Sequence, residues 1–267
     1  MIRDITLGQY YQGDSIVHKL DPRVKLIATI VYIVSLFIYT NSVVAYGLAF
    51  LFLALSIWLS KVPVKFILKG LKAIVFLLLF TSVFNLFLTK GEAVLTLWKL
   101  TITKEGIENA IFIAIRLMLL IVGSSVMTLT TTPNQLTDAL EKLLKPLQKL
   151  HVPVHEIAMM MSIALRFIPI LLEETDKIMK AQMARGADFE SGNLLKKIKA
   201  MVPLLVPLFI SAFRRANDLA MAMEARCYQG GDGRTKMKPL IYRKCDAIGY
   251  LVLVLYMLVL CTVGRYF

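Results

Sequence analysis

The sequence predicts an all-α polytopic membrane protein of about five transmembrane helices, together with a cytoplasmic region of three amphipathic helices. Composition is the first reason: 57% of the 267 residues are hydrophobic, against about 45–50% in soluble domains. Charged residues make up only 18%, and the mean hydropathy is +0.67. These values exclude intrinsic disorder, a collagen-like fibre and a disulfide-stapled secreted module, and they argue against an ordinary cytosolic enzyme.

Five apolar runs have the length of a membrane span. The shortest contain 17 residues, which cover about 26 Å of a ~30 Å hydrocarbon core when helical. Each run is expected to be a helix because backbone groups in lipid need internal hydrogen-bond partners. Arg116 interrupts the fourth run and is expected to bond backbone carbonyls or to reach the cytoplasmic side. The runs are Val24–Thr40, Val43–Leu59, Phe66–Leu88, Ile107–Leu129 and Ala247–Val263.

The distribution of positive charge orients these spans. The net charge is +13, from 31 Lys and Arg against 18 Asp and Glu. In so apolar a chain this surplus favours a cytoplasmic face against anionic lipid over nucleic-acid binding. Lys61, Lys65, Lys69 and Lys72 follow the second run with no acid among them, and the N-terminal segment is also basic. The positive-inside rule therefore predicts a multi-pass protein of the cell membrane with a cytoplasmic N-terminus.

The sequence separates into three parts: an N-terminal membrane part at 1–129, an amphipathic basic part at 130–246, and a C-terminal span at 247–267. The middle part predicts three helices from their periodicity and their end signals. Its apolar stretch at 155–172 leaves open whether it lies in the membrane or in the cytoplasm. The predicted helices run from Thr132-Pro133 to about Leu150, from about His155 to Arg185, and from about Val202 to Cys227.

Both long helices of the middle part end in an alanine followed by an arginine, 41 residues apart. The first end reads Ala184-Arg185-Gly186 and the second reads Ala225-Arg226-Cys227. A single such end has a structural explanation, since a cation complements the helix dipole and glycine suits the position after a helix. Two of them favour a functional role, because a guanidinium group binds carboxylates through two parallel hydrogen bonds and suits an acidic groove on a partner.

Motifs for catalysis or metal binding are not found in the sequence. It contains no G-x-x-x-x-G-K-[ST] phosphate loop and no G-x-S-x-G nucleophile elbow, so we expect neither ATP binding nor hydrolysis by this chain. His151 and His155 are separated by Val-Pro-Val, and Pro153 breaks the helix that a zinc site would need. The three cysteines show no paired spacing and are expected to be free thiols. No cofactor or metal is therefore expected.

Several segments together resemble a known family, the transmembrane T component (EcfT/CbiQ family) of energy-coupling factor (ECF) vitamin and metal importers. The resemblance extends over nearly the whole chain, and its specific signal is the pair of arginine tripeptides. The matching segments are Leu20–Lys25, Leu129–Pro133, Ala164–Pro169, Ala184–Gly186 and Glu224–Arg226.

The resemblance implies a non-catalytic scaffold whose amphipathic middle part is a coupling region. Such a subunit holds two cytoplasmic ABC-type ATPases and a membrane-embedded S component that captures the substrate. The second tripeptide departs from the family pattern, because Cys227 adopts a left-handed conformation less easily than glycine, which puts the geometry of that helix end in question. The implied ATPase-binding residues are Ala184, Arg185, Gly186, Ala225, Arg226 and Cys227.

Two alternative functions fit the sequence less well than a scaffold. A self-sufficient secondary transporter usually shows inverted repeats and membrane-embedded acids, and neither is visible in the sequence. A membrane enzyme lacks a recognisable set of nucleophile, base and orienting residue. The sequence does not identify the transported substrate, whose recognition would belong to the S component.

Overall fold

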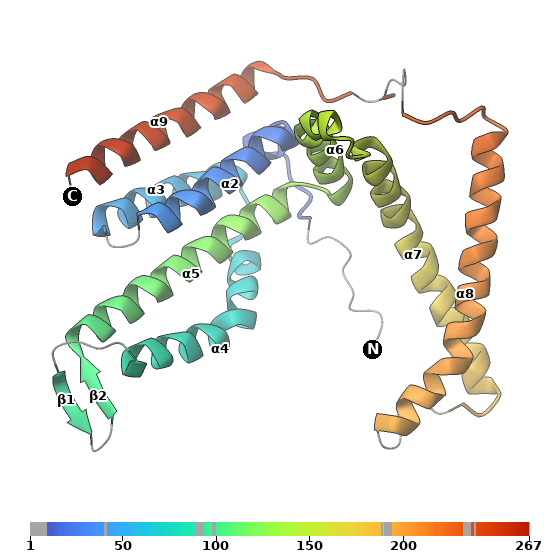
Figure 1. Cartoon of the computed structure of the whole chain (residues 1–267), viewed down its shortest axis with the longest axis horizontal. Coiled ribbons are helices and arrows are strands. Elements are labelled where there is room, and N and C mark those ends of the chain that lie inside the picture. The colour runs from blue at the N-terminus through green and yellow to red at the C-terminus, as the bar shows by residue number, and fades with distance from the viewer. Residues whose placement is uncertain are drawn as a thin grey trace. The chain divides into compact units, whose positions relative to one another are not determined.

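A computed structural model describes residues 10–39, 42–88, 93–97, 100–187, 189, 194–231, 236–237 and 239–266. The chain divides into two compact units. The bundle unit comprises residues 8–139 and 240–267, and the arm unit comprises residues 140–239 with 1–7. Figure 1 shows long helices in both units.

The bundle unit contains a helix at each of the five predicted spans, which confirms the all-α polytopic class. Among the described residues, four helices are long and apolar enough to cross a membrane: α3, α5, the segment Lys244–Val263 of α9, and α7 of the arm unit. The shorter α2 has 17 residues, and α4 contains the apolar segment Ile74–Leu86. The five helices are α2 (Pro22–Ile38), α3 (Val43–Ser60), α4 (Val64–Leu88), α5 (Lys104–Thr130) and α9 (Lys244–Tyr266).

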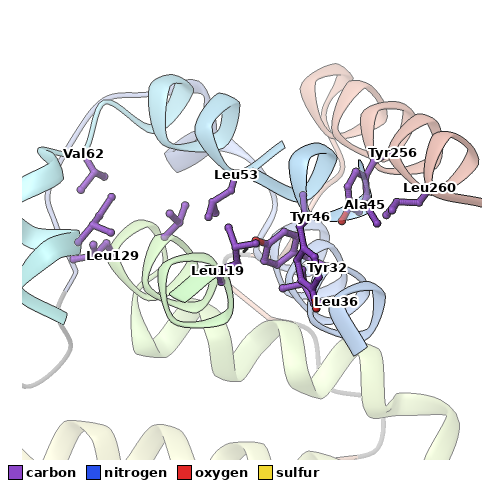
Figure 2. Close-up of a cluster of buried hydrophobic side chains, with 13 residues drawn as sticks. Tyr32, Leu36, Ala45, Tyr46, Leu53, Val62, Leu119, Leu129, Tyr256 and Leu260 are labelled. Atoms are coloured by element: carbon purple, nitrogen blue, oxygen red, sulfur yellow. Dashed lines mark hydrogen bonds between the residues drawn. The ribbon is translucent and has the colours of Figure 1, made fainter. Parts of the chain in front are cut away.

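Small residues and hydroxyl groups join the helices of the bundle. Gly123 of α5 lies so close to the ring of Tyr32 in α2 that a Cβ atom there would clash with it. The hydroxyls of Ser35 in α2 and Tyr256 in α9 lie 2.8 Å apart. Such contacts replace hydrophobic driving force inside a membrane, where lipid is as apolar as the side chains. Figure 2 shows the buried cluster that α2, α3, α5 and α9 form around these tyrosines.

A short hairpin lies between α4 and α5, where the sequence indicated only a loop. Strands β1 (Ala93–Leu97) and β2 (Leu100–Thr103) pair antiparallel with a register shift near Ala93. Thr103 ends the hairpin and begins the next helix, because its hydroxyl accepts a hydrogen bond from the Gly106 amide at 3.1 Å. A four-residue helix, α1 (Ile16–Lys19), precedes α2 and packs against α3.

The arm unit consists mainly of two 31-residue helices, α7 (Val154–Ala184) and α8 (Leu194–Glu224). They pack antiparallel, as Figure 1 shows. The side-chain amide of Gln182 donates from Nε2 to the Pro203 carbonyl at 3.3 Å, and Arg215 donates to Glu174 at 2.8 Å. Along the chain, α6 (Pro133–Leu144) and a 3₁₀ helix, η2 (Lys145–Leu150), precede α7.

Two predicted helix bounds in this region are wrong. The first amphipathic helix does not stay α-helical to Leu150, because Pro146 lacks an amide hydrogen and the last six residues tighten into a 3₁₀ helix. The third helix begins at Leu194 rather than at Val202. Its first eight residues favour a helix strongly enough to tolerate Pro203 and Pro207, which lie inside the helix rather than near its start.

Candidate functional site

The first arginine end is closed by a Schellman motif. The amide of Ala187 donates to the Gln182 carbonyl at 3.0 Å, and the amide of Gly186 donates to the Met183 carbonyl at 2.9 Å. Gly186 takes the left-handed φ of 88° that this motif requires. Arg185 therefore lies at the last turn of α7, where its side chain is exposed.

The second arginine end has the same motif, residue for residue. The amide of Tyr228 donates to the Met223 carbonyl at 3.1 Å, and the amide of Cys227 donates to the Glu224 carbonyl at 2.8 Å. Cys227 adopts the left-handed conformation, with φ 56°. The sequence put the geometry of this helix end in question because cysteine replaces glycine. The hydrogen bonds are nevertheless the same as at the first end. Arg226 is exposed, like its counterpart in α7.

The two arginines lie at opposite ends of the antiparallel helix pair. The contacts of Gln182 with Pro203 and of Glu174 with Arg215 place residue 226 beside about residue 160 of α7. About 25 residues of helix therefore separate the two ends, which corresponds to about 38 Å. The structure brings each predicted tripeptide into one exposed turn and keeps the two turns apart.

A polar cluster in the bundle unit was missed by sequence reasoning. Asp246 is 1% exposed at the start of α9. Its carboxylate accepts the amide of Asp21, from the start of α2, at 2.7 Å and the amide of Arg243 at 2.6 Å. Asp246 therefore caps its own helix and fixes the start of α2 beside it. We name Asp21, Arg23, Tyr242 and Asp246 the aspartate clamp.

Arg23 completes the aspartate clamp. Its guanidinium group donates two hydrogen bonds to Asp21, at 2.8 and 3.0 Å, and lies 3.8 Å from the centre of the Tyr242 ring. Burial by itself raises the pKa of Asp21, but the hydrogen bonds from Arg23 outweigh it and hold that pKa below its usual value. The Leu20–Lys25 segment, which the sequence indicated only through its family resemblance, thus has a structural role.

A second charged cluster lies in the arm unit at the start of α7. Glu141 of α6 accepts a hydrogen bond from Lys236 at 2.5 Å and contacts His155 Nδ1 at 2.8 Å. Gly231 packs on the His155 ring so closely that no Cβ fits there. Burial raises the pKa of Glu141, yet Lys236 and His155 together lower it below its usual value. His155 therefore joins α6 and α7 through a hydrogen bond.

The remaining candidates of the sequence take structural positions. Arg116 donates from Nε to the Tyr46 hydroxyl at 2.9 Å and lies 5.9 Å from the centre of the Phe37 ring, so it contacts side chains of two other helices. The three cysteines are free thiols, as predicted. Within the part of the chain that the structure describes, no group of three His, Cys, Asp or Glu side chains is arranged to hold a metal ion.

Fold and site together define a polytopic helical membrane protein whose helical arm presents two matched arginine ends. The family model for the cobalt transport protein, CbiQ, matches residues 13–237. Three curated relatives are each called energy-coupling factor transporter transmembrane protein EcfT. The relative from Clostridium kluyveri is 59% identical over 253 residues, covering 94% of this chain and 93% of that protein. The chain therefore belongs to the CbiQ family of transmembrane proteins of energy-coupling factor transporters.

The other two relatives show that the similarity holds across several bacteria. The protein from Ruminiclostridium cellulolyticum is 56% identical over 248 residues, covering 93% of this chain and 92% of the relative. The protein from Bacillus subtilis is 49% identical over 247 residues, covering 92% and 93%. This chain is thus a transmembrane component of a transporter, and the name of its relatives implies a complex of several subunits.

Proposed function

We propose that this chain is the transmembrane scaffold subunit of an ECF-type ABC importer in the cell membrane, with a cytoplasmic N-terminus. Arg185 and Arg226 each dock one of two cytoplasmic ABC-type ATPases. A membrane-embedded S component binds the vitamin or metal ion, and movement of the ATPases reorients it through the coupling helices. The observation that supports this best is the matched pair of exposed arginine ends on α7 and α8.

The geometry of the pair favours two partner molecules over one. Each end shows its guanidinium group on the same closed turn, so two identical or similar acidic grooves would accept them in the same way. The separation of about 38 Å along the helices is comparable with the diameter of a small domain. Two separate subunits can therefore bind without colliding, and a displacement of either one would act on the same rigid helix pair.

The absence of a phosphate-loop motif from the sequence supports a division of labour. A transporter component without such a motif requires ATPase partners to use ATP. The basic, exposed end of each coupling helix is suited to a protein partner whose groove is acidic, since charge complementarity speeds association and fixes register. The proposed scaffold is accordingly not an enzyme, and it needs no cofactor of its own.

The test is co-purification of the full complex from cells that express this chain, the two ATPases and the S component. We expect Arg185→Ala and Arg226→Ala each to lower the amount of bound ATPase about tenfold or more, since truncating one partner of a desolvated charged pair costs about 2–5 kcal/mol. The double variant should lose ATP-driven uptake. Arg→Lys at either site should restore binding only in part, because ammonium lacks the planar fork.

A matched control is Lys180→Ala, which removes an exposed cation from α7 one turn before the arginine end. It should leave ATPase recovery and uptake unchanged. Full recovery and uptake in the double arginine variant would overturn the assignment. Transport by the purified chain alone in liposomes would instead support the self-sufficient secondary transporter.

A further inference from the structure

The bundle unit contains an apolar groove with a basic mouth. Its volume is about 1180 Å³, and it lies between α1, α3, α4 and α5. Along α3 it is lined by residues spaced three or four apart, so one face of that helix forms its wall. We name it the α3–α5 groove. Its lining includes Phe50, Ala54 and Trp58 of α3, Lys61 directly after α3, Met118 of α5, and Lys19 of α1.

The length of the groove matches one leaflet of a bilayer. Phe50 of α3 and Lys61, the residue that caps the end of α3, lie at its two ends and are eleven residues apart. Eleven residues of helix extend about 16 Å, and half of a ~30 Å hydrocarbon core is about 15 Å. Trp58 is 76% exposed one turn before Lys61, as expected of an aromatic side chain at the membrane interface. The groove therefore extends from the interface to about the middle of the bilayer.

The mouth of the groove is suited to an anionic headgroup. Lys19 and Lys61 both line it, and the acid beside them, Asp14, is 94% exposed and lies 3.8 Å from Lys19. Such an exposed ion pair is weak and leaves both lysines accessible to a phosphate. Lys61 has a left-handed φ of 53°, a conformation in which glycine would be unstrained. This conformation ends α3, where the Lys61 amide donates to the Trp58 carbonyl at 3.3 Å.

We propose that the α3–α5 groove binds an anionic phospholipid of the cytoplasmic leaflet. One acyl chain lies along α3 against Phe50, Ala54 and Met118, and the phosphate group lies between Lys19 and Lys61. Basic pockets between transmembrane helices on the cytoplasmic side suit anionic headgroups for this reason. The proposal rests on the membrane orientation proposed above, which places the end of α3 in the cytoplasmic leaflet, but it does not depend on where the ATPases dock.

The first experiment measures lipid selectivity by native mass spectrometry. The full chain is taken from nanodiscs of phosphatidylglycerol and phosphatidylethanolamine in equal parts, and the lipids that remain bound are counted. We expect a preference for phosphatidylglycerol that falls about fivefold for each of Lys19→Gln and Lys61→Gln. Lys180→Gln, on the arm, is the matched control and should retain the preference. Equal retention of both lipids by the unaltered chain would overturn the proposal, as would an unchanged preference in the double lysine variant.

The second experiment fills the groove. Ala54→Trp places a large ring where the acyl chain is proposed, whereas Leu51→Trp places the same ring at a 65% exposed position of α3 that does not line the groove. We expect the first variant to lose bound phosphatidylglycerol and the second to keep it, with helical content unchanged in both. If Ala54→Trp keeps its lipid but releases a membrane partner from the co-purified complex, the groove belongs to a partner helix and the proposal fails. ATPase recovery, which tests the proposed function, should not change in either variant.

Discussion

Replacing Cys227 with glycine should stabilise the second arginine end. Cys227 is exposed and holds a left-handed φ of 56°, so its thiol contributes no burial while its Cβ is strained. A left-handed conformation costs an L-residue about 1–2 kcal/mol. Glycine avoids that cost but loses about 0.5–1 kcal/mol more through its greater freedom in the unfolded chain. The net expectation for Cys227→Gly is a gain of about 0.5–1 kcal/mol.

The stabilisation by Cys227→Gly should be visible in the melting temperature of the whole chain and in amide exchange at the helix end. For a chain of this size it corresponds to a rise of about 1–4 °C in melting temperature, measured by circular dichroism in detergent. Amide exchange at residue 227 and at Tyr228 should slow, because these amides make the two hydrogen bonds that close the helix. Cys227→Ala is the control, since it removes the thiol but keeps the Cβ, and it should leave both readouts unchanged. Equal behaviour of the glycine and alanine variants would refute the strain argument.

Two further predictions concern the clusters that fix helix starts. Asp246→Ala leaves the amides of Asp21 and Arg243 without their buried acceptor, so the free energy of unfolding should fall by about 2–4 kcal/mol; a smaller loss in a thermal melt would mean that water replaces the carboxylate. The pKa of Glu141 is lowered in the folded chain, so its ionised form stabilises the fold. This contribution to the free energy of unfolding should be fully present above the unfolded pKa of about 4.3. It should be lost as the pH falls through the lower pKa of the folded chain. Melting temperatures of Glu141→Gln and the unaltered chain should therefore converge in acid, and a constant difference down to about pH 3 would contradict this linkage.

The features that the sequence predicted best depend on residues that are close together in the sequence. Apolar runs located all five bundle helices to within a few residues at each end, because a helix in lipid is defined by its own hydropathy. The two arginine ends were also predicted, since the signals of a helix end lie within one turn. Failures occurred where local preferences compete: Pro146 converted the end of one helix to 3₁₀, and Pro203 did not stop α8 from starting at Leu194.

Contacts between distant residues left no signal in the sequence. Asp21 and Asp246 are 225 residues apart and would repel each other as free carboxylates. They lie together because one of them accepts the other's backbone amide, while Arg23 neutralises the first through two hydrogen bonds. Likewise, nothing in the spacing of Glu141 and Lys236 predicted an ion pair. Such pairs follow from the packing of whole helices, which a single sequence does not specify.

The capping geometry explains how one chain can present two equivalent docking points. Each hydrogen bond at the end of α7 recurs 41 residues later at the end of α8, and all of them are local to one turn. The backbone conformation that carries each arginine is therefore set by its own helix end. Since the ends are about 38 Å apart and share no partner residue, the losses in ATPase binding from Arg185→Ala and Arg226→Ala should add to within about 0.5 kcal/mol. A larger coupling energy would show that a single ATPase contacts both ends, which the antiparallel arrangement does not favour.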